Sequence, residues 1–294
     1  MVIRTESSFL ELDLQNGGRI LCLELISLKG RRRKVIWADP ALDFFFSGSF
    51  LMFPWVNRLE SDRFNINGNR IEIEPVLKDE AGYPIHGLYF KSERRCVSVS
   101  EGIESSEIII EPIQTDSLFP SFRETFSLER SRLTVSLEVF GSSDKEMYFS
   151  AGYHPYIGLE GRPIDSLEII SNCTETVLLG DDLLPETPIR KKPFKSAVQT
   201  GKIDTLKLDH CFTGNSSHPY FGIFDRTENE KVILEIHRSF NPSVFFQIYT
   251  PPHRQSIAVE PMSSLGNSFS EKNGTHSSIK KNDIKVFSFS VRLE

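Results

Sequence analysis

One carboxylate and two histidines in this 294-residue chain could move protons, and each stands in a setting that restricts its backbone. Glu260 follows the apolar run 257–259 and precedes Pro261, which predicts a strand that the proline ends just after the carboxylate. His86 stands before a glycine, and His154 is the centre of the sequence Gly-Tyr-His-Pro-Tyr. A carboxylate that accepts a proton and an imidazole that donates one are sufficient for acid–base chemistry without a cofactor.

Three further polar residues follow apolar or mixed segments. Asn57 and Arg58 come after the aromatic run 52–56, and Asp209 follows 204–208. Taken singly, an arginine in such a place is more often a structural ion pair, and a lone histidine is usually structural or at the surface. The tyrosines on either side of His154 make a site more plausible there. Aromatic faces that cover C–H patches, next to groups that bind hydroxyls, are typical of a sugar site.

Other kinds of active site have weaker support. His210, His218, His237 and His253 have no HxH or HxxxH spacing that would order them as zinc ligands. The chain also lacks the GxSxG, P-loop and GxGxxG patterns. We therefore expect no metal and no cofactor.

Hydrophobic periodicity predicts an all-β protein. Apolar and polar residues alternate over 133–139, 232–236 and 287–293, which is typical of strands with one solvated face. Asn67-Gly68 predicts a tight hairpin turn, and 122–128 is expected to return through a short turn into 133–139. No window of a dozen residues has an apolar stripe at helical spacing.

Composition predicts one large antiparallel β-sandwich domain spanning residues 1–294. Hydrophobic residues make up 39% of the chain, enough for a sizeable core, and no composition break separates two domains. The polar stretches 161–163 and 270–281 are expected to be surface loops. The four cysteines are scattered and are expected to be reduced and mostly buried.

Charge and the N-terminus bear on partners and location. A net charge of −6 argues against nucleic acid as a partner. The N-terminal sequence lacks the features of a signal peptide, and no apolar stretch is long enough to span a membrane. We expect a soluble, cytoplasmic monomer or homodimer that acts on a small molecule and has no membrane partner.

The motifs together resemble those of the aldose 1-epimerase (galactose mutarotase) family. Five segments match in order: Asn57-Arg58-Leu59, His86-Gly87, Gly152-Tyr153-His154-Pro155-Tyr156, Asp209-His210-Cys211-Phe212 and Val259-Glu260-Pro261-Met262. Each is short, but five in the right order over most of the chain are quite specific. The resemblance implies a large antiparallel β-sandwich, in agreement with the periodicity.

The resemblance also implies a role for each residue. Glu260 matches the general base that removes the proton from the C1 hydroxyl of a pyranose, and His154 matches the general acid that protonates the ring oxygen. His86 matches a second histidine near that oxygen. Arg58 and Asp209 match groups that hydrogen-bond sugar hydroxyls. Asn57 is a weaker match for the same role. The implied activity is interconversion of the α and β anomers of a hexose or related aldose.

Two alternatives remain open at this point. One is a carbohydrate-binding or sugar-sensing protein that has the same fold but no turnover. The other is a mutarotase for a phosphorylated hexose, because the basic segments 29–34 and 190–192 could hold a phosphate. Each basic segment could equally be a solvated surface turn. A glycosidase or lyase is less favoured, since no paired-carboxylate motif is evident.

Overall fold

The computed structural model describes residues 1–194, 201–214, 216–272 and 274–294. Within them, twelve strands form the larger sheet, sheet A, and every strand pair is antiparallel. Its main path, in spatial order, is β1 (Val2–Arg4), β2 (Phe9–Asp13), β3 (Arg19–Ile26), β4 (Arg32–Trp37), β14 (Tyr156–Ile157), β22 (Ile257–Met262), β21 (Phe245–Tyr249), β18 (Asp209–Thr213), β16 (Glu175–Val177) and β17 (Lys191–Pro193). Two short strands join it from the side: β13 (Gly152–Tyr153) on β22, and β5 (Leu51–Met52) on β13.

A second antiparallel sheet, sheet B, has eight strands within the described residues. Its order is β15 (Glu168–Ser171), β19 (Tyr220–Asp225), β20 (Glu230–Arg238), β24 (Ile284–Leu293), β11 (Arg132–Phe140), β10 (Ser121–Glu129), β9 (Ser105–Pro112) and β8 (Arg94–Ser100). Two small pairs lie outside the sheets, β6 (Arg63–Ile66) with β7 (Asn69–Glu72), and β12 (Met147–Phe149) with β23 (Ser277–Ile279). The helical elements in the described ranges are 3₁₀ turns, η1 (Phe44–Phe46) and η2 (Ile164–Ser166). No described helix is long and apolar enough to cross a membrane.

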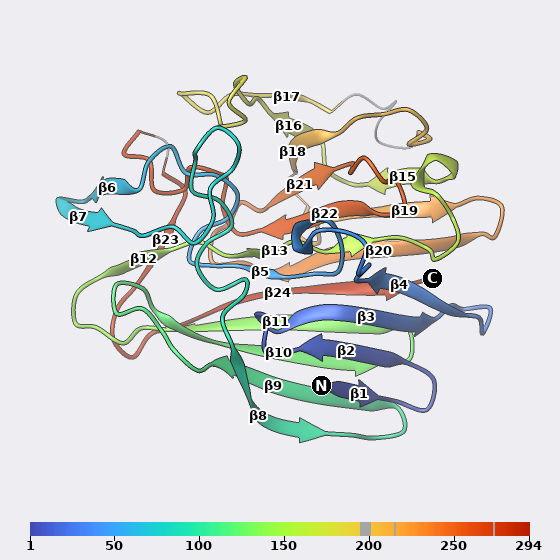
Figure 1. Ribbon diagram of the computed structural model, residues 1–294. Helices are drawn as coiled ribbons and strands as arrows, with labels where there is room; N and C mark the ends of the chain where they lie inside the picture. The colour runs from blue at the N-terminus through green and yellow to red at the C-terminus, as the bar shows by residue number, and fades with distance from the viewer. Residues whose placement is uncertain (195–200, 215, 273) are drawn as a thin grey trace.

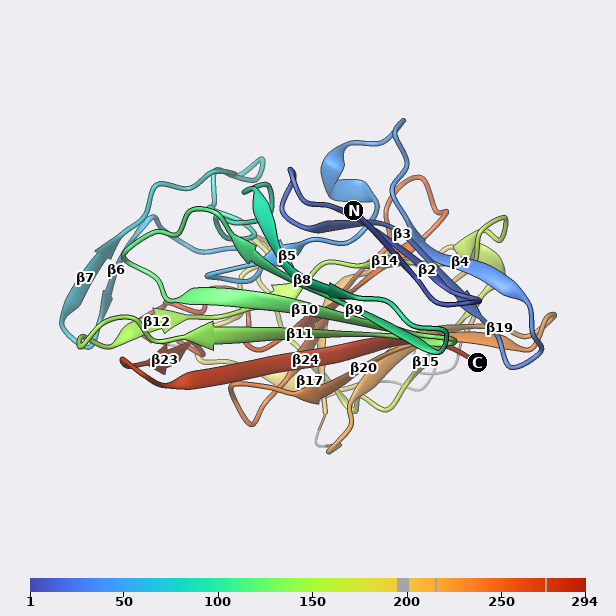
Figure 2. The same cartoon turned by 90° about the horizontal axis from the view of Figure 1, so that it is seen from below.

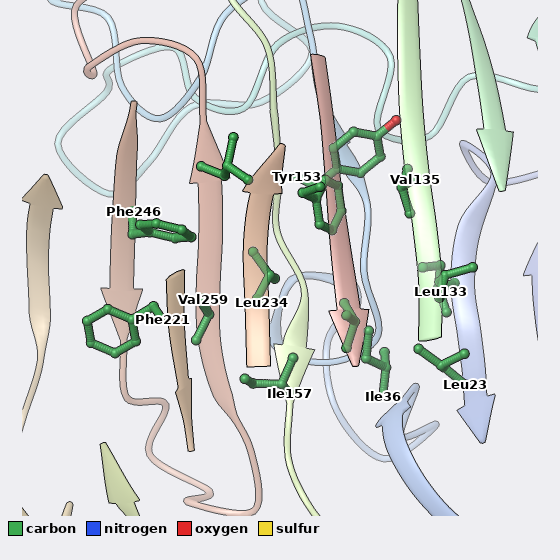
Figure 3. Packing of buried hydrophobic residues seen from close by; sticks show 14 of the residues in the cluster. Leu23, Ile36, Leu133, Val135, Tyr153, Ile157, Phe221, Leu234, Phe246 and Val259 are labelled. Carbon is green, nitrogen blue, oxygen red and sulfur yellow. The ribbon is translucent and has the colours of Figure 1, made fainter. Parts of the chain in front are cut away.

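The two sheets pack as the layers of a sandwich (Figures 1 and 2). The core between them takes side chains from both, among them Ile157 and Val259 of sheet A and Val135 and Leu234 of sheet B (Figure 3). Burial of so many branched and aromatic side chains is the main stabilising contribution. The prediction of an antiparallel β-sandwich is confirmed.

The predicted hairpins are also present. Phe122 pairs with Val139 across β10 and β11, and β6 returns into β7 through Asn67 and Gly68, whose φ angles are 51° and 80°. Two consecutive residues with positive φ are what a tight hairpin turn requires, and Asn-Gly is the pair that adopts them most readily. The β6–β7 hairpin and the β12–β23 pair lie at the same end of the molecule in both views (Figures 1 and 2).

Pro261 does not end its strand, contrary to the sequence-based expectation. β22 continues to Met262, and Pro261 pairs with Phe246 of β21. On the other side of β22, the N–H groups of Val259 and Ser263 donate to the carbonyls of Pro155 and Ala151. The nitrogen of Pro261, which carries no hydrogen, therefore faces the break between β13 and β14, where no ladder bond is lost.

Two smaller expectations were also wrong in part. The stretch 270–281 is not wholly loop, because Ser277–Ile279 forms β23 against β12; residue 273 lies outside the described residues. None of the four cysteines, all of them in the described part of the chain, forms a disulfide, but Cys96 is exposed and Cys22 is half-buried. Cys96 lies on β8, an edge strand of sheet B in which residues 95–100 are all exposed.

Candidate active site

Strand alternation separates the candidate site from the sandwich core. In β22, Ile257 and Val259 point into the core, so Ala258, Glu260 and Met262 point to the opposite face of sheet A. The same alternation applies next to it in β21, where Phe246 and Ile248 pack in the core. Gln247 therefore lies on the face of Glu260, and the two are register partners. Polar residues on this face can line a cleft without disturbing the core.

His154 lies opposite Glu260 because of the register between β22 and its two short neighbours. Gly152 pairs with Met262, and Tyr156 pairs with Ala258, so the residue midway between them faces Glu260. The Nε2 atom of His154 lies 3.2 Å from Oε1 of Glu260. The His154 ring is packed between two aromatic rings, Phe50 at 4.8 Å and Tyr156 at 5.0 Å between ring centroids. The imidazole is thus fixed in orientation towards the carboxylate.

A tight backbone turn presents His86 to the same cleft. His86 has a φ of 64° and Gly87 one of 81°. A Cβ atom on Gly87 would lie 2.1 Å from the carbonyl oxygen of Phe53, so only glycine fits this approach. The His86 ring meets His154 edge to face, with centroids 5.2 Å apart, and its Nδ1 lies 3.1 Å from Sδ of Met52.

Arg58 and Asn57 lie on the loop that runs beside His86. The Nε atom of Arg58 donates to Oδ2 of Asp79 at 2.6 Å, and its Nη1 donates to Oδ1 of Asn57 at 3.3 Å. The carbonyl of Asn57 accepts the backbone N–H of His86 at 3.0 Å. Asn57 thus ties Arg58 to the His86 turn.

Asp209 begins β18, two strands away from Glu260 across β21. Its Oδ1 accepts a hydrogen bond of 2.6 Å from Nε2 of Gln247. The amide of Gln247 therefore orients Asp209 while its backbone pairs with that of Glu260. Sequence reasoning did not select Gln247 or Asp79. Gln247 is the one strongly polar side chain within an aromatic and aliphatic strand, which is a usable signal, whereas nothing in the sequence marks Asp79 as a partner for Arg58.

All six candidate residues line one cleft of about 630 Å³. The cleft brings together Glu260, His154, His86, Arg58, Asp209 and Asn57. Glu260 is 2% exposed and His154 is 5% exposed, so the centre of the cleft is shielded from solvent. Within the described residues, Oε2 of Glu260 and Nδ1 of His154 have no hydrogen-bond partner. Buried polar atoms without partners are rare and costly, and they are expected where a ligand completes the bonding.

Burial favours the neutral forms of the site's proton carriers. It raises the pKa of Glu260 well above its usual value, with a further contribution from the Asp209 carboxylate that Arg58 opposes. Burial lowers the pKa of His154 to about 3. It also lowers the pKa of His86 well below its usual value, to which His154 and Arg58 add. These shifts favour a protonated Glu260 beside a neutral His154, so that the pair holds one proton between an acid and a base in contact.

The cleft is acidic overall. Two cationic residues line it, Arg58 and Lys78, and Arg58 is already paired with Asp79. The acidic lining residues are Asp79, Glu80, Asp181, Asp182, Asp209 and Glu260. An acidic lining opposes an anionic ligand and accepts a neutral polyhydroxyl compound.

Comparison with known proteins identifies the family of the chain. The family model of aldose 1-epimerase matches residues 15–280. The chain belongs to the aldose 1-epimerase family. Among curated proteins, YphB of Escherichia coli K12, itself uncharacterized, is 28% identical over 110 residues, which are 37% of each chain.

Several solved structures have the same fold as this member of the aldose 1-epimerase family. A galactose mutarotase-like protein from Clostridium acetobutylicum superposes with a TM-score of 0.81 at 14% identity, covering 100% of this chain and 94% of the other. A GalM/aldose epimerase homologue from C. elegans gives 0.73 at 13% identity, covering 100% and 98%. Galactose 1-epimerase from Lactobacillus acidophilus gives 0.72 at 15% identity, covering 99% and 92%. At these identities the likeness concerns the fold alone.

Proposed function

We propose that this protein is an aldose 1-epimerase that interconverts the anomers of a free, unphosphorylated aldose. The observation that carries the proposal is the contact of 3.2 Å between His154 Nε2 and Glu260 Oε1 at the shielded centre of the cleft. A protein that only binds sugar has no need of a base and an acid that touch in a buried place. A hexose-sized ligand also fits a cleft of about 630 Å³.

The His154–Glu260 pair shares one proton in two forms. One form is a carboxylic acid beside a neutral imidazole, and the other is a carboxylate beside an imidazolium. Burial favours the first form, and the hydroxyls of a bound sugar stabilise the second by replacing the lost hydration. Anomerisation starts from the second form and produces the first.

The reaction balances with these two groups alone. Glu260 takes the proton of the C1 hydroxyl, the C1–O1 carbonyl forms, and the bond from C1 to the ring oxygen breaks as that oxygen takes the proton of His154. Rotation about C1–C2 presents the other face of the aldehyde. Closure returns one proton to His154 and the other to O1. In this scheme, Arg58 and Asp209 hold hydroxyls, and His86 packs against His154 near the ring oxygen.

An unphosphorylated substrate is favoured over a phosphorylated one because of charge. The basic segments considered for phosphate do not line the cleft. Arg33 pairs with Glu230 at 2.8 Å, Lys34 with Glu160 at 2.7 Å, and Lys191 with Glu175 at 3.2 Å. Both segments therefore have partners on the protein surface, while the cleft itself has an excess of carboxylates.

Exchange NMR of the anomeric signals tests the proposal. Glucose, galactose, other aldoses and hexose 6-phosphates are compared with and without the protein. We expect acceleration for at least one free aldose, and a fall of about 10²–10⁴-fold in the Glu260→Gln variant, which retains sugar binding. Glu104→Gln, on an exposed turn, serves as the matched control. Acceleration of no sugar would contradict the enzyme proposal and leave binding as the function.

A further inference from the structure

Two histidines and a glutamate meet on the outer face of sheet B, far from the cleft in the fold. The Nδ1 atom of His218 lies 3.5 Å from Oε1 of Glu235, and Nδ1 of His237 lies 3.6 Å from the same oxygen. One potential ligand atom from each of the three residues lies within 4.8 Å of those of the other two. Linear spacing does not reveal the cluster, because the chain brings His218 to the other two through the β19–β20 hairpin.

The backbone holds all three residues on one side of the sheet. Glu235 lies between Leu234 and Ile236, which pack in the core, so it points to the other face. His237 occupies a β-bulge, and its contact with Ser290, the register partner of Glu235, places its ring on the same face as Glu235. His218 lies in the turn before β19. The carbonyl of Pro219 accepts the N–H of Ile236 at 3.0 Å, and the carbonyl of His218 accepts an N–H of Asn172 at 2.9 Å.

Neighbouring groups orient two of the three side chains. His237 Nε2 lies 2.8 Å from Oγ of Ser290; when that nitrogen carries the hydrogen and donates it, Nδ1 presents a lone pair towards Glu235. The other carboxylate oxygen of Glu235 accepts a bond from Arg292, which leaves Oε1 facing the histidines. Arg292 also donates to Glu294 at 2.8 Å, so a second carboxylate offsets its charge.

The distances fit a tetrahedral metal ion. Nitrogen and oxygen ligands held about 2.0–2.2 Å from Zn²⁺ are about 3.3–3.5 Å from one another. The two distances to Glu235 are already near this value. The His218 side chain is 65% exposed, so it can rotate to shorten the third distance.

We propose that His218, Glu235 and His237 bind one divalent transition-metal ion of the Zn²⁺ type. Two imidazoles and one carboxylate suit Zn²⁺, Co²⁺, Ni²⁺ or Cu²⁺, whereas Mg²⁺ and Ca²⁺ prefer oxygen ligands alone. The bound ion joins the turn before β19 to the face of β20. It does not contact the cleft, so it acts on stability and not on the acid–base chemistry.

Isothermal titration of the tag-free, chelator-treated protein with Zn²⁺ tests the site, and Co²⁺ absorption in the visible range reports the geometry. We expect one equivalent to bind, tetrahedral Co²⁺ bands, and a rise in Tm with added Zn²⁺. His218→Gln and His237→Gln each lower the affinity at least about tenfold and abolish the rise in Tm. His218→Gln changes a largely exposed side chain and is therefore expected to fold.

His253→Gln is the matched control, because it removes another histidine from a different loop. It should keep the full affinity and the Co²⁺ bands. The proposal would be overturned by the absence of Zn²⁺ binding to the unaltered protein at about 100 µM. An affinity for Zn²⁺ in His218→Gln and His237→Gln as high as that of the unaltered protein would overturn it too. So would a loss of affinity in His253→Gln as large as the loss in those two variants.

Discussion

His154 and Glu260 face each other across a break in the ladder of sheet A, with 3.2 Å between Nε2 and Oε1. The break exists because β13 and β14 are two short strands against one continuous β22. It frees the side chain of His154 to turn towards the carboxylate while the paired residues on both sides fix its backbone. The contact between these two side chains is therefore set by strand register.

The two histidines of the cleft should contribute unequally. His154→Asn should lower kcat about 10²–10⁴-fold, because it removes the group that contacts Glu260. His86→Asn should lower kcat less, since His86 touches the ring of His154 and not the carboxylate. Asparagine tolerates the positive φ at position 86, so this variant keeps the turn. Steady-state rates of anomer exchange check the order, and an equal loss in both variants would contradict it.

Stability should change with pH in opposite directions when either member of the pair is removed. Folding raises the pKa of Glu260, so its stabilising contribution is lost as pH rises from about 4.5 towards the folded-state pKa. Folding lowers the pKa of His154 to about 3, so its contribution is lost as pH falls from about 6.5 towards 3. Between pH 5 and 6.5 the two effects offset each other.

Removing one member therefore exposes the effect of the other. In His154→Asn, the free energy of unfolding should fall more steeply with rising pH than in the unaltered protein. The difference between the two slopes should be up to about 1.4 kcal/mol per pH unit. In Glu260→Gln the free energy of unfolding should rise with pH by a similar amount. Urea unfolding at pH 5.0, 5.5, 6.0 and 6.5 measures both slopes. Slopes equal to that of the unaltered protein would show that the pair does not have these shifted pKa values.

Asp79 should matter for sugar affinity through Arg58. Asp79→Asn removes the charge that holds the guanidinium at 2.6 Å while keeping the side-chain size. We expect KM to rise about three- to tenfold with a smaller change in kcat, which corresponds to about 1 kcal/mol of binding. Asp62→Asn is a suitable control, because Asp62 makes a distant contact of 3.9 Å with Lys78. An unchanged KM would mean that Arg58 does not need this partner.

Gly87 should be far less replaceable than Gly68, although their φ angles are 81° and 80°. A Cβ on Gly87 would lie 2.1 Å from the Phe53 carbonyl oxygen, while one on Gly68 would meet nothing within 4 Å. Gly68→Ala should cost about 1–2 kcal/mol of unfolding free energy from backbone strain alone. Gly87→Ala should cost about 3 kcal/mol or more, since the backbone of Phe53 must also move. Thermal unfolding of both variants decides whether the close approach adds to the strain.

Local pattern was enough to predict many of the elements. Alternation over 133–139 and the Asn67-Gly68 turn predicted β11 and the β6–β7 hairpin, because side-chain direction in a strand and φ at a tight turn are local properties. Pro261 shows where local reasoning failed. A proline is expected to end a strand, but the missing N–H costs nothing where the neighbouring strand is interrupted, and that interruption is a property of the sheet.

The sequence by itself determined which chemical groups the chain offers. The order of the motifs around Arg58, His86, His154, Asp209 and Glu260 also identified the family. Only the tertiary structure decided which groups touch. The register of β22 brings His154 to Glu260, Asp79 holds Arg58, and the β19–β20 hairpin brings His218 to Glu235 and His237. Contacts between residues distant in the chain depend on how strands pair, and burial, which sets the protonation of the site, exists only once the sheets have packed.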